Sequence, residues 1–219
     1  MIDLQALLEA SAARHDHLCP RQVLGVRAGL AGLSALDLSF PVENKSLLVI
    51  VETDGCFTDG IEAATGATVG HRTLRVEDYG KIAATFVKVS SGEAVRISPR
   101  LDVRQRAWVY TPNEANQYES QLRAYQLMPD PELFNICKVE LSVSLEKIIS
   151  QAGLRILCDN CGEEIINERE IHHEGFTLCR ACAGPAYYLL PHIRQEQTLP
   201  ASSTSADSAN SPSPYNPLR

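Results

Sequence analysis

Residues 15–20 read His15-Asp16-His17-Leu18-Cys19-Pro20. Imidazole and thiolate groups are common ligands of zinc-type metal ions, and this segment carries three of them within five residues. Pro20 opens a periodic apolar segment, and proline suits the first position of a helix. Cys19 is therefore expected at a helix N-terminus, where the partial positive charge of the helix favours a thiolate. We interpret this segment as part of a metal site.

A single downstream cysteine, Cys56, completes the predicted site. It follows an apolar run over residues 46–53 that is rich in β-branched side chains, and it opens a moderately helical segment. A strand followed by a helix places Cys56 at a second helix N-terminus, at the edge of a rigid sheet. Each cysteine taken singly is more often a small buried hydrophobe. Taken together, four residues predict a shared core metal site, with His15 as a ligand or as a partner of a ligand: His15, His17, Cys19 and Cys56.

The rest of the first 150 residues alternates helical and strand patterns. Helices are expected over residues 2–14 and from Pro20 to about Leu36, and small glycines in the second helix indicate close packing against a neighbour. A hairpin is expected from two strands at 82–89 and 94–97. Two helices follow between Pro99 and Met128, separated at Pro112-Asn113, and a strand is expected at 136–141, where Cys137 is interpreted as structural.

A charged turn lies before the predicted hairpin. Asp78, Tyr79 and Lys81 offer a carboxylate, a phenol and an ammonium group. Asp78 and Lys81 are candidate acid and base groups beside the core metal. A solvated turn without a chemical role is the alternative interpretation of the same residues.

A second cysteine motif lies between residues 151 and 194. Two Cys-x-x-Cys pairs, Cys158/Cys161 and Cys179/Cys182, are separated by seventeen residues, a spacing typical of a four-cysteine zinc site. Four thiolates fill a tetrahedral shell, so this zinc is expected to be structural. We expect a treble-clef-like ribbon in which residues 165–166 pair with 176–178, followed by a helix through Ala186 to Leu190. A redox Cys-x-x-Cys is the competing interpretation, and His172-His173 is expected to be exposed.

Composition limits the class of partners. Residues 1–150 carry 15 Lys and Arg against 19 Asp and Glu, and residues 151–219 carry 5 against 8, giving a net charge of −7. A nucleic-acid ligand is unexpected because no basic stripe is present. The chain contains no apolar run long enough for a membrane span and no secretory address, so we expect a cytoplasmic protein. Residues 195–219 contain six Ser and four Pro, which predicts a disordered tail.

Several short motifs in fixed order resemble the FmdE family of formylmethanofuran dehydrogenase proteins. They cover roughly residues 10 to 190 and are His15-Asp16-His17-Leu18-Cys19-Pro20, Val51-Glu52-Thr53-Asp54-Gly55-Cys56, Asp59-Gly60-Ile61, Thr65-Gly66-Ala67-Thr68-Val69-Gly70 and Asp78-Tyr79-Gly80-Lys81. The resemblance implies an α+β core (1–150) with a mixed β-sheet flanked by helices, a zinc-type core metal, the appended zinc ribbon (151–194) and a homodimer. The chain departs from the family pattern at Arg21, Ala67 and His71, and His71 is interpreted as a surface or hydrogen-bonded residue.

Two classes of function remain open. In the first, the protein is a non-catalytic metal-binding accessory factor that binds a small C1 or acyl metabolite or cofactor, or that docks on a larger oxidoreductase. In the second, the core metal keeps an open position and polarises a carbonyl or activates water on a small substrate. No redox cofactor motif is recognisable in the sequence, which favours the accessory role.

Overall fold

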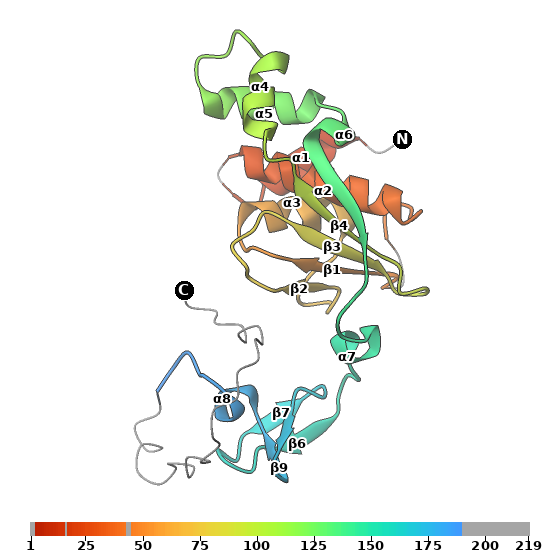
Figure 1. Cartoon of the computed structure of the whole chain (residues 1–219), viewed down its shortest axis with the longest axis vertical. Coiled ribbons are helices and arrows are strands. Elements are labelled where there is room, and N and C mark those ends of the chain that lie inside the picture. The colour runs from red at the N-terminus through yellow and green to blue at the C-terminus, as the bar shows by residue number, and fades with distance from the viewer. Residues whose placement is uncertain (1–2, 16, 43–44, 190–219) are drawn as a thin grey trace, which may run out of the picture. The chain divides into compact units, whose positions relative to one another are not determined.

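The chain forms two compact units in a computed structural model that describes residues 3–15, 17–42 and 45–189 (Figure 1). The first unit ends at Ile148 and the second begins at Ile149. The predicted disordered tail, residues 195–219, lies outside the described residues. None of the described helices combines the length and the hydropathy that a membrane crossing requires.

The first unit is built on a five-stranded mixed sheet, which confirms the predicted α+β class. Its strand order is β2-β1-β3-β4-β5, with β1 parallel to β2 and the other neighbours antiparallel. The strands are β1 (Leu47–Val51), β2 (Leu74–Val76), β3 (Ala84–Lys88), β4 (Ala94–Pro99) and β5 (Phe134–Val139). The predicted central strand, hairpin and last strand are confirmed as β1, β3–β4 and β5.

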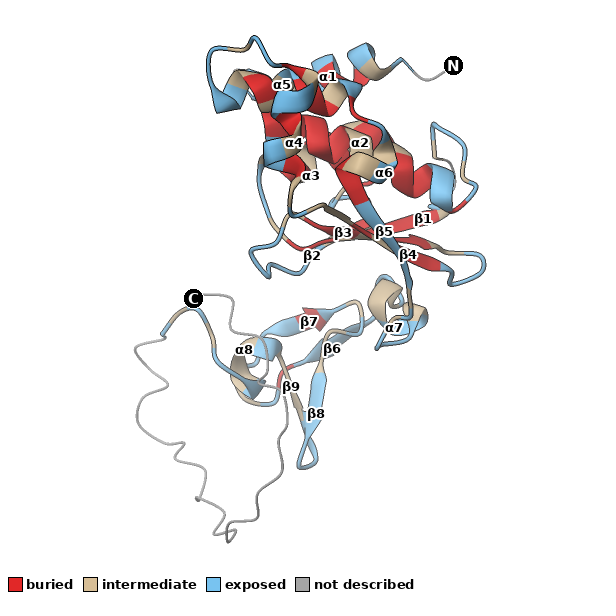
Figure 2. Ribbon diagram, turned by 45° about the horizontal axis from the view of Figure 1, so that its top comes forward, coloured by how far each residue is buried: buried red, intermediate tan, exposed pale blue. Residues whose placement is uncertain are grey.

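Helices cover one face of this sheet, where most of the buried side chains lie (Figure 2). The long helix α2 packs against β3 and β4. The described helices of the first unit, which include those predicted from the periodicity, are α1 (Leu4–Ala12), α2 (Pro20–Ala35), α3 (Cys56–Thr65), α4 (Val103–Tyr110), α5 (Gln117–Leu127), α6 (Asp130–Leu133) and α7 (Leu145–Ile149).

Glycines let α2 and α3 cross with their backbones in contact, as the sequence predicts. A Cβ atom at Gly25 would lie 2.1 Å from the Phe57 carbonyl oxygen, and one at Gly60 would lie 2.3 Å from the Gln22 carbonyl oxygen. Real Cβ atoms do not approach backbone atoms so closely, so only glycine fits either position. The crossing lies near the first turns of both helices and brings their N-termini together.

The second unit is a ribbon of two short hairpins and one helical turn. β6 (Arg155–Leu157) pairs with β7 (Glu164–Ile166), and β8 (Ile171–His173) pairs with β9 (Phe176–Leu178). The predicted pairing of 165–166 with 176–178 is therefore wrong. The helix α8 (Arg180–Ala183) is also shorter than expected, because the backbone is already extended at Gly184. His172-His173 lies exposed in the second hairpin, as predicted.

Candidate functional site

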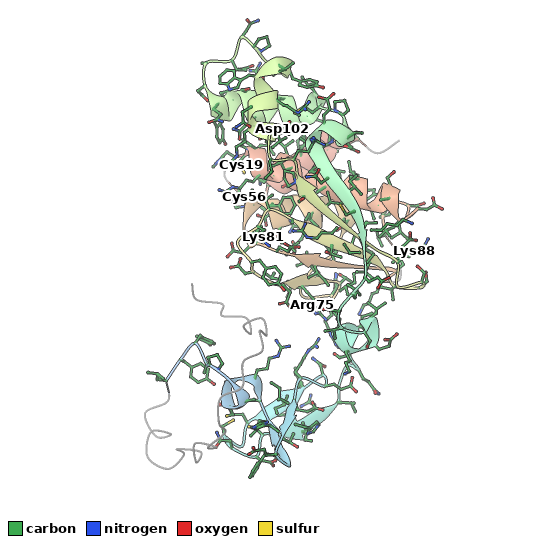
Figure 3. The ribbon with its side chains drawn as sticks, in the orientation of Figure 1. Cys19, Cys56, Arg75, Lys81, Lys88 and Asp102 are labelled. Atoms are coloured by element: carbon green, nitrogen blue, oxygen red, sulfur yellow. The ribbon has the colours of Figure 1, made fainter. Side chains whose placement is uncertain are left out.

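The structure brings Cys19 and Cys56 together at the N-termini of two crossing helices (Figure 3). Cys19 is the N-cap of α2, and Cys56 is the first residue of α3. Burial raises the pKa of the Cys56 thiol above its ordinary value, and its hydrogen bond with the Cys19 thiol raises that pKa further. The expectation that the helix terminus alone would favour a Cys56 thiolate is therefore wrong, and a bound cation is needed to stabilise that form.

Gln22 fixes the backbone at Cys19. Its side-chain oxygen accepts a hydrogen bond of 2.8 Å from the Cys19 backbone N–H, and its side-chain nitrogen donates one of 2.9 Å to the Ser11 carbonyl oxygen. Gln22 is fully buried. The end of α1 and the start of α2 are thus tied together beside the two sulfur atoms.

The two predicted histidine ligands lie differently from the cysteines. His15 Nε2 lies 2.5 Å from Asp59 Oδ2, and Asp59 is one helical turn after Cys56. The negative charge of Asp59 acts on the Cys56 thiol. His17 is exposed, and within the described part of the chain no hydrogen bond or ion pair of its side chain is found. His15 thus approaches the thiols through Asp59, and the four-ligand core set stays a prediction.

A cleft of about 750 Å³ opens beside the two thiols. Its walls come from the start of α2, the start of α3, the segment before β3, and helices α4 and α5. The lining residues are Cys19, Pro20, Arg21, Leu24, Cys56, Lys81, Ile82, Pro99, Arg100, Leu101, Val103, Arg104, Gln105, Tyr118, Gln121 and Tyr125. Sequence reasoning missed the contribution of α4 and α5, because no local pattern indicates that these helices close over the cysteines.

Of the two predicted acid and base residues, Lys81 lines the cleft and Asp78 does not. The backbone N–H groups of Tyr79 and Lys81 donate to the Glu52 carbonyl oxygen at 3.0 and 3.1 Å. The Glu52 carboxylate in turn accepts two hydrogen bonds from Arg96, at 2.5 and 2.7 Å. This arrangement fixes the turn that carries Lys81. Asp78 Oδ1 accepts a hydrogen bond from the Gly80 backbone N–H within the same turn.

Two further residues singled out in the sequence lie away from the thiols. His71 is exposed and lines a separate small cavity of about 230 Å³. Its backbone N–H donates to Thr68 Oγ1 at 3.2 Å. Cys137 is exposed on the edge strand β5. Neither residue lines the cleft.

In the ribbon, the four predicted cysteines converge. The sulfur atoms of Cys158, Cys161, Cys179 and Cys182 all lie within 4.8 Å of one another, and those of Cys161 and Cys179 are 4.0 Å apart. Zinc bound by four thiolates at about 2.3 Å places the sulfurs roughly 3.8 Å apart. The cluster therefore fits a tetrahedral metal ion. Among the described residues, it is the one group of three or more His, Cys, Asp or Glu ligand atoms that converges in this way.

The thiols of this cluster differ in acidity. Burial raises the pKa of Cys158, but backbone N–H groups of Cys161, Cys179 and Asn160 donate to its sulfur and lower the pKa to about 6. Burial raises the pKa of Cys182 to about 12, and the adjacent thiols contribute. Four neighbouring thiols cannot all ionise without a cation among them. A divalent metal ion supplies that charge and favours the loss of all four protons.

Asp159 joins the two halves of the cluster. Its backbone N–H donates to the Thr177 carbonyl oxygen at 2.8 Å, and its carboxylate accepts from the Thr177 backbone N–H at 2.6 Å. The first cysteine pair is thereby held against the strand that precedes the second. Sequence reasoning did not single out Asp159, because its partner lies eighteen residues away.

Comparisons with known proteins agree with this architecture. The chain is 35% identical over 205 residues to the "Probable S-adenosyl-L-methionine-binding protein" of Archaeoglobus fulgidus, covering 84% of this chain and 54% of that protein, so it spans about half the length of this curated relative. It also resembles the crystal structure of an FmdE-like protein of tungsten formylmethanofuran dehydrogenase from Syntrophus aciditrophicus, with a TM-score of 0.51 and 21% identity over 86% of this chain and 96% of that chain. That likeness concerns the fold.

The family assignment rests on the first unit. The family described as "FmdE, Molybdenum formylmethanofuran dehydrogenase operon" matches residues 14–135, which include both core cysteines and every strand of the five-stranded sheet except the end of β5. More than half of the chain is matched. The chain therefore belongs to the FmdE family.

Proposed function

We propose that this protein is a metal-binding accessory protein whose core unit binds a small metabolite or cofactor in the cleft beside Cys19 and Cys56. The observation that carries the proposal is the pairing of these two thiols in the wall of a 750 Å³ cleft. Small-molecule sites in proteins commonly have volumes of about 300–1,000 Å³. Paired thiols suit a zinc-type ion, which would then stand at the cleft wall.

The ribbon metal is proposed to be zinc with a structural role. Four sulfur ligands leave no open coordination position, so this ion would hold the ribbon together and would not act on a substrate. We further propose that the protein is a cytoplasmic homodimer and that it associates with a larger oxidoreductase. The family membership supports this association.

In the core, Cys19 and Cys56 would supply two ligands. His15 and Asp59 already contact one another beside Cys56, so either side chain can complete the set after a small movement. His17, which is exposed one residue before Leu18, is the remaining candidate. A set of three protein ligands would leave one position for a metabolite.

A second candidate function is a metal-dependent enzyme, and the position of Lys81 in the cleft favours it. An ammonium group within reach of a metal-bound substrate can move a proton or stabilise a developing negative charge. S-adenosyl-L-methionine is a ligand to test directly, because the relative from Archaeoglobus fulgidus carries that name.

Metal analysis tests the proposal. The full chain, purified with zinc, is expected to hold two ions, the Cys56→Ala variant one, and the matched control Cys137→Ala two, because Cys137 lies exposed on β5. X-ray absorption at the zinc edge is expected to change from mixed ligands toward sulfur alone when the core ion is lost. One ion per chain in all three proteins would contradict the core metal site and with it the proposed function.

A further inference from the structure

We propose that the ligand of the cleft is an oxyanion, a carboxylate- or phosphate-bearing small molecule, and that Arg21 and Arg104 bind its charged group. This inference rests on the proposed function and names the class of ligand. It follows from the charges that line the cleft, from their lack of internal partners, and from the polar groups around them.

The lining of the cleft is cationic. It contains four basic side chains, Arg21, Lys81, Arg100 and Arg104, and none of its sixteen lining residues is an aspartate or a glutamate. The protein as a whole has a net charge of −7. Basic side chains therefore gather in this cleft against the overall charge of the chain, as expected of a site for an anion.

Two of these cations have no counter-ion in the described structure. Arg100 lies 3.4 Å from Asp102, which is labelled in Figure 3, and Lys81 lies 5.8 Å from the centre of the Tyr79 ring. For Arg21 and Arg104, by contrast, no ion pair or side-chain hydrogen bond is found within residues 3–15, 17–42 and 45–189. Their guanidinium groups are free to bind a ligand.

The two free arginines belong to different walls of the cleft. Arg21 lies in the first turn of α2, two residues after Cys19, whereas Arg104 is the second residue of α4. Both helix N-termini add partial positive charge, and a guanidinium group presents a planar pair of donors that matches a carboxylate or a phosphate. One anionic group can thus meet a cation from each wall.

The interior beside Arg104 offers neutral donors. The positive charge of Arg104 acts on the phenol of Tyr125, a side chain that is almost fully buried and that also lines the cleft. The amides of Gln105 and Gln121 lie in the same lining. Tyr118 donates a hydrogen bond of 3.3 Å to the Leu18 carbonyl oxygen and so stands next to the thiol pair. An oxyanion near Arg104 would have donors from α4 and α5.

A bound metal ion does not change the sign of this charge. Two thiolates and one divalent cation together are neutral, and Asp59 is engaged by His15. The four basic side chains then still leave the cleft positive. A ligand whose reactive group is a cation, such as a sulfonium, would lie in an unfavourable field, whereas a carboxylate or a phosphate would be attracted.

Isothermal titration of the full chain with inorganic pyrophosphate and with succinate tests this inference and separates the two sources of the oxyanion. At least one of them is expected to bind. Arg21→Gln and Arg104→Gln are each expected to weaken that binding about tenfold, because a charged hydrogen bond contributes about 1.5 kcal/mol or more. Arg104→Lys, which keeps the charge, should recover part of the affinity.

The matched control is Arg123→Gln. Arg123 lies on α5 outside the cleft lining and pairs with Glu114 at 3.1 Å, so its loss should leave the affinity unchanged. Circular dichroism of each variant checks that it is folded. As a second readout, the bound anion should slow alkylation of Cys56 in the unmodified chain, which requires no variant.

Three results would overturn the inference. They are absence of binding by both anions, equal affinity in all five proteins, and tighter binding of S-adenosyl-L-methionine that neither arginine variant changes. The proposed function fails on a different measurement, since it is refuted by the metal content of Cys56→Ala. An anion-binding chain without a core metal, or a core metal without anion binding, would therefore identify which of the two proposals is wrong.

Discussion

Gln22 shows how much of the site depends on a residue that is not itself reactive. Its side chain is fully buried and satisfies both the Cys19 N–H and the Ser11 carbonyl oxygen. Replacing it by alanine leaves both backbone groups without a partner. We expect Gln22→Ala to lower the free energy of unfolding by about 2–3 kcal/mol, measured by urea denaturation. Gln5→Ala, at an exposed position of α1, is the control and should change it by less than about 0.5 kcal/mol.

Tyr125 predicts a loss of stability at alkaline pH. Burial raises the pKa of its phenol to about 12, above the ordinary value of 10.0. The unfolded chain therefore releases this proton first, and stability that is complete below pH 10 is lost as the pH rises toward 12. Between pH 9 and pH 11 we expect a contribution of about 1 kcal/mol. Urea denaturation should show a steeper alkaline loss for the unmodified chain than for Tyr125→Phe, and equal slopes would contradict the prediction.

At the scale of single residues, the sequence predicted the cysteines well and their partners poorly. The two Cys-x-x-Cys pairs carry their spacing along the chain, so the ribbon cluster could be predicted in full. Asp59 could have been found from its position three residues after Cys56, on the same face of a helix. Arg104 and Tyr118 could not, because they meet the cysteines only through the packing of α4 and α5.

Among the elements, the crossing of α2 and α3 determines where the thiols lie. A methyl group at Gly60 would lie 2.3 Å from the Gln22 carbonyl oxygen and 2.7 Å from the Val26 nitrogen. Alanine gains about 1 kcal/mol of helix propensity over glycine, but overpacking against backbone costs about 3 kcal/mol. We therefore expect Gly60→Ala to destabilise the core and to lower the amount of core metal.

Thermal unfolding and metal analysis measure both effects. Gly70→Ala is the control, because no atom lies within 4 Å of a Cβ built at Gly70. This control should behave like the unmodified chain. A Gly60→Ala variant with unchanged stability and metal content would show that the helix crossing tolerates separation.

Elements with a clear period were predicted, and short ones were not. The sixteen residues of α2 and the alternating strands β3 and β4 leave a periodic signal. β2 has three residues and leaves none, so it was missed. The same reason explains the wrong hairpin in the ribbon, where strands of three residues can be paired in several ways. The extra constraint is the cysteine cluster, which holds each knuckle beside its own hairpin.

At the scale of the molecule, the two units should respond separately to loss of the ribbon metal. The ribbon has few buried apolar residues of its own, and its stability depends on the cysteine cluster. We expect Cys179→Ser to unfold the ribbon and to leave the first unit folded. Near-UV circular dichroism and a thermal scan should retain one cooperative transition. Loss of all cooperative unfolding would contradict the independence of the two units.

The cationic cleft also has a kinetic consequence for a chain of net charge −7. An anion far from the surface is repelled by the whole molecule and meets the attraction of the cleft only at short range. Salt at 0.1 M screens interactions beyond about 10 Å, so it weakens the distant repulsion more than the contact with the arginines. Stopped-flow measurements with pyrophosphate should therefore show an association rate that rises with ionic strength, the reverse of the usual behaviour of a cationic binding site. Capture of the anion would then be fastest where the long-range field of the protein is least felt.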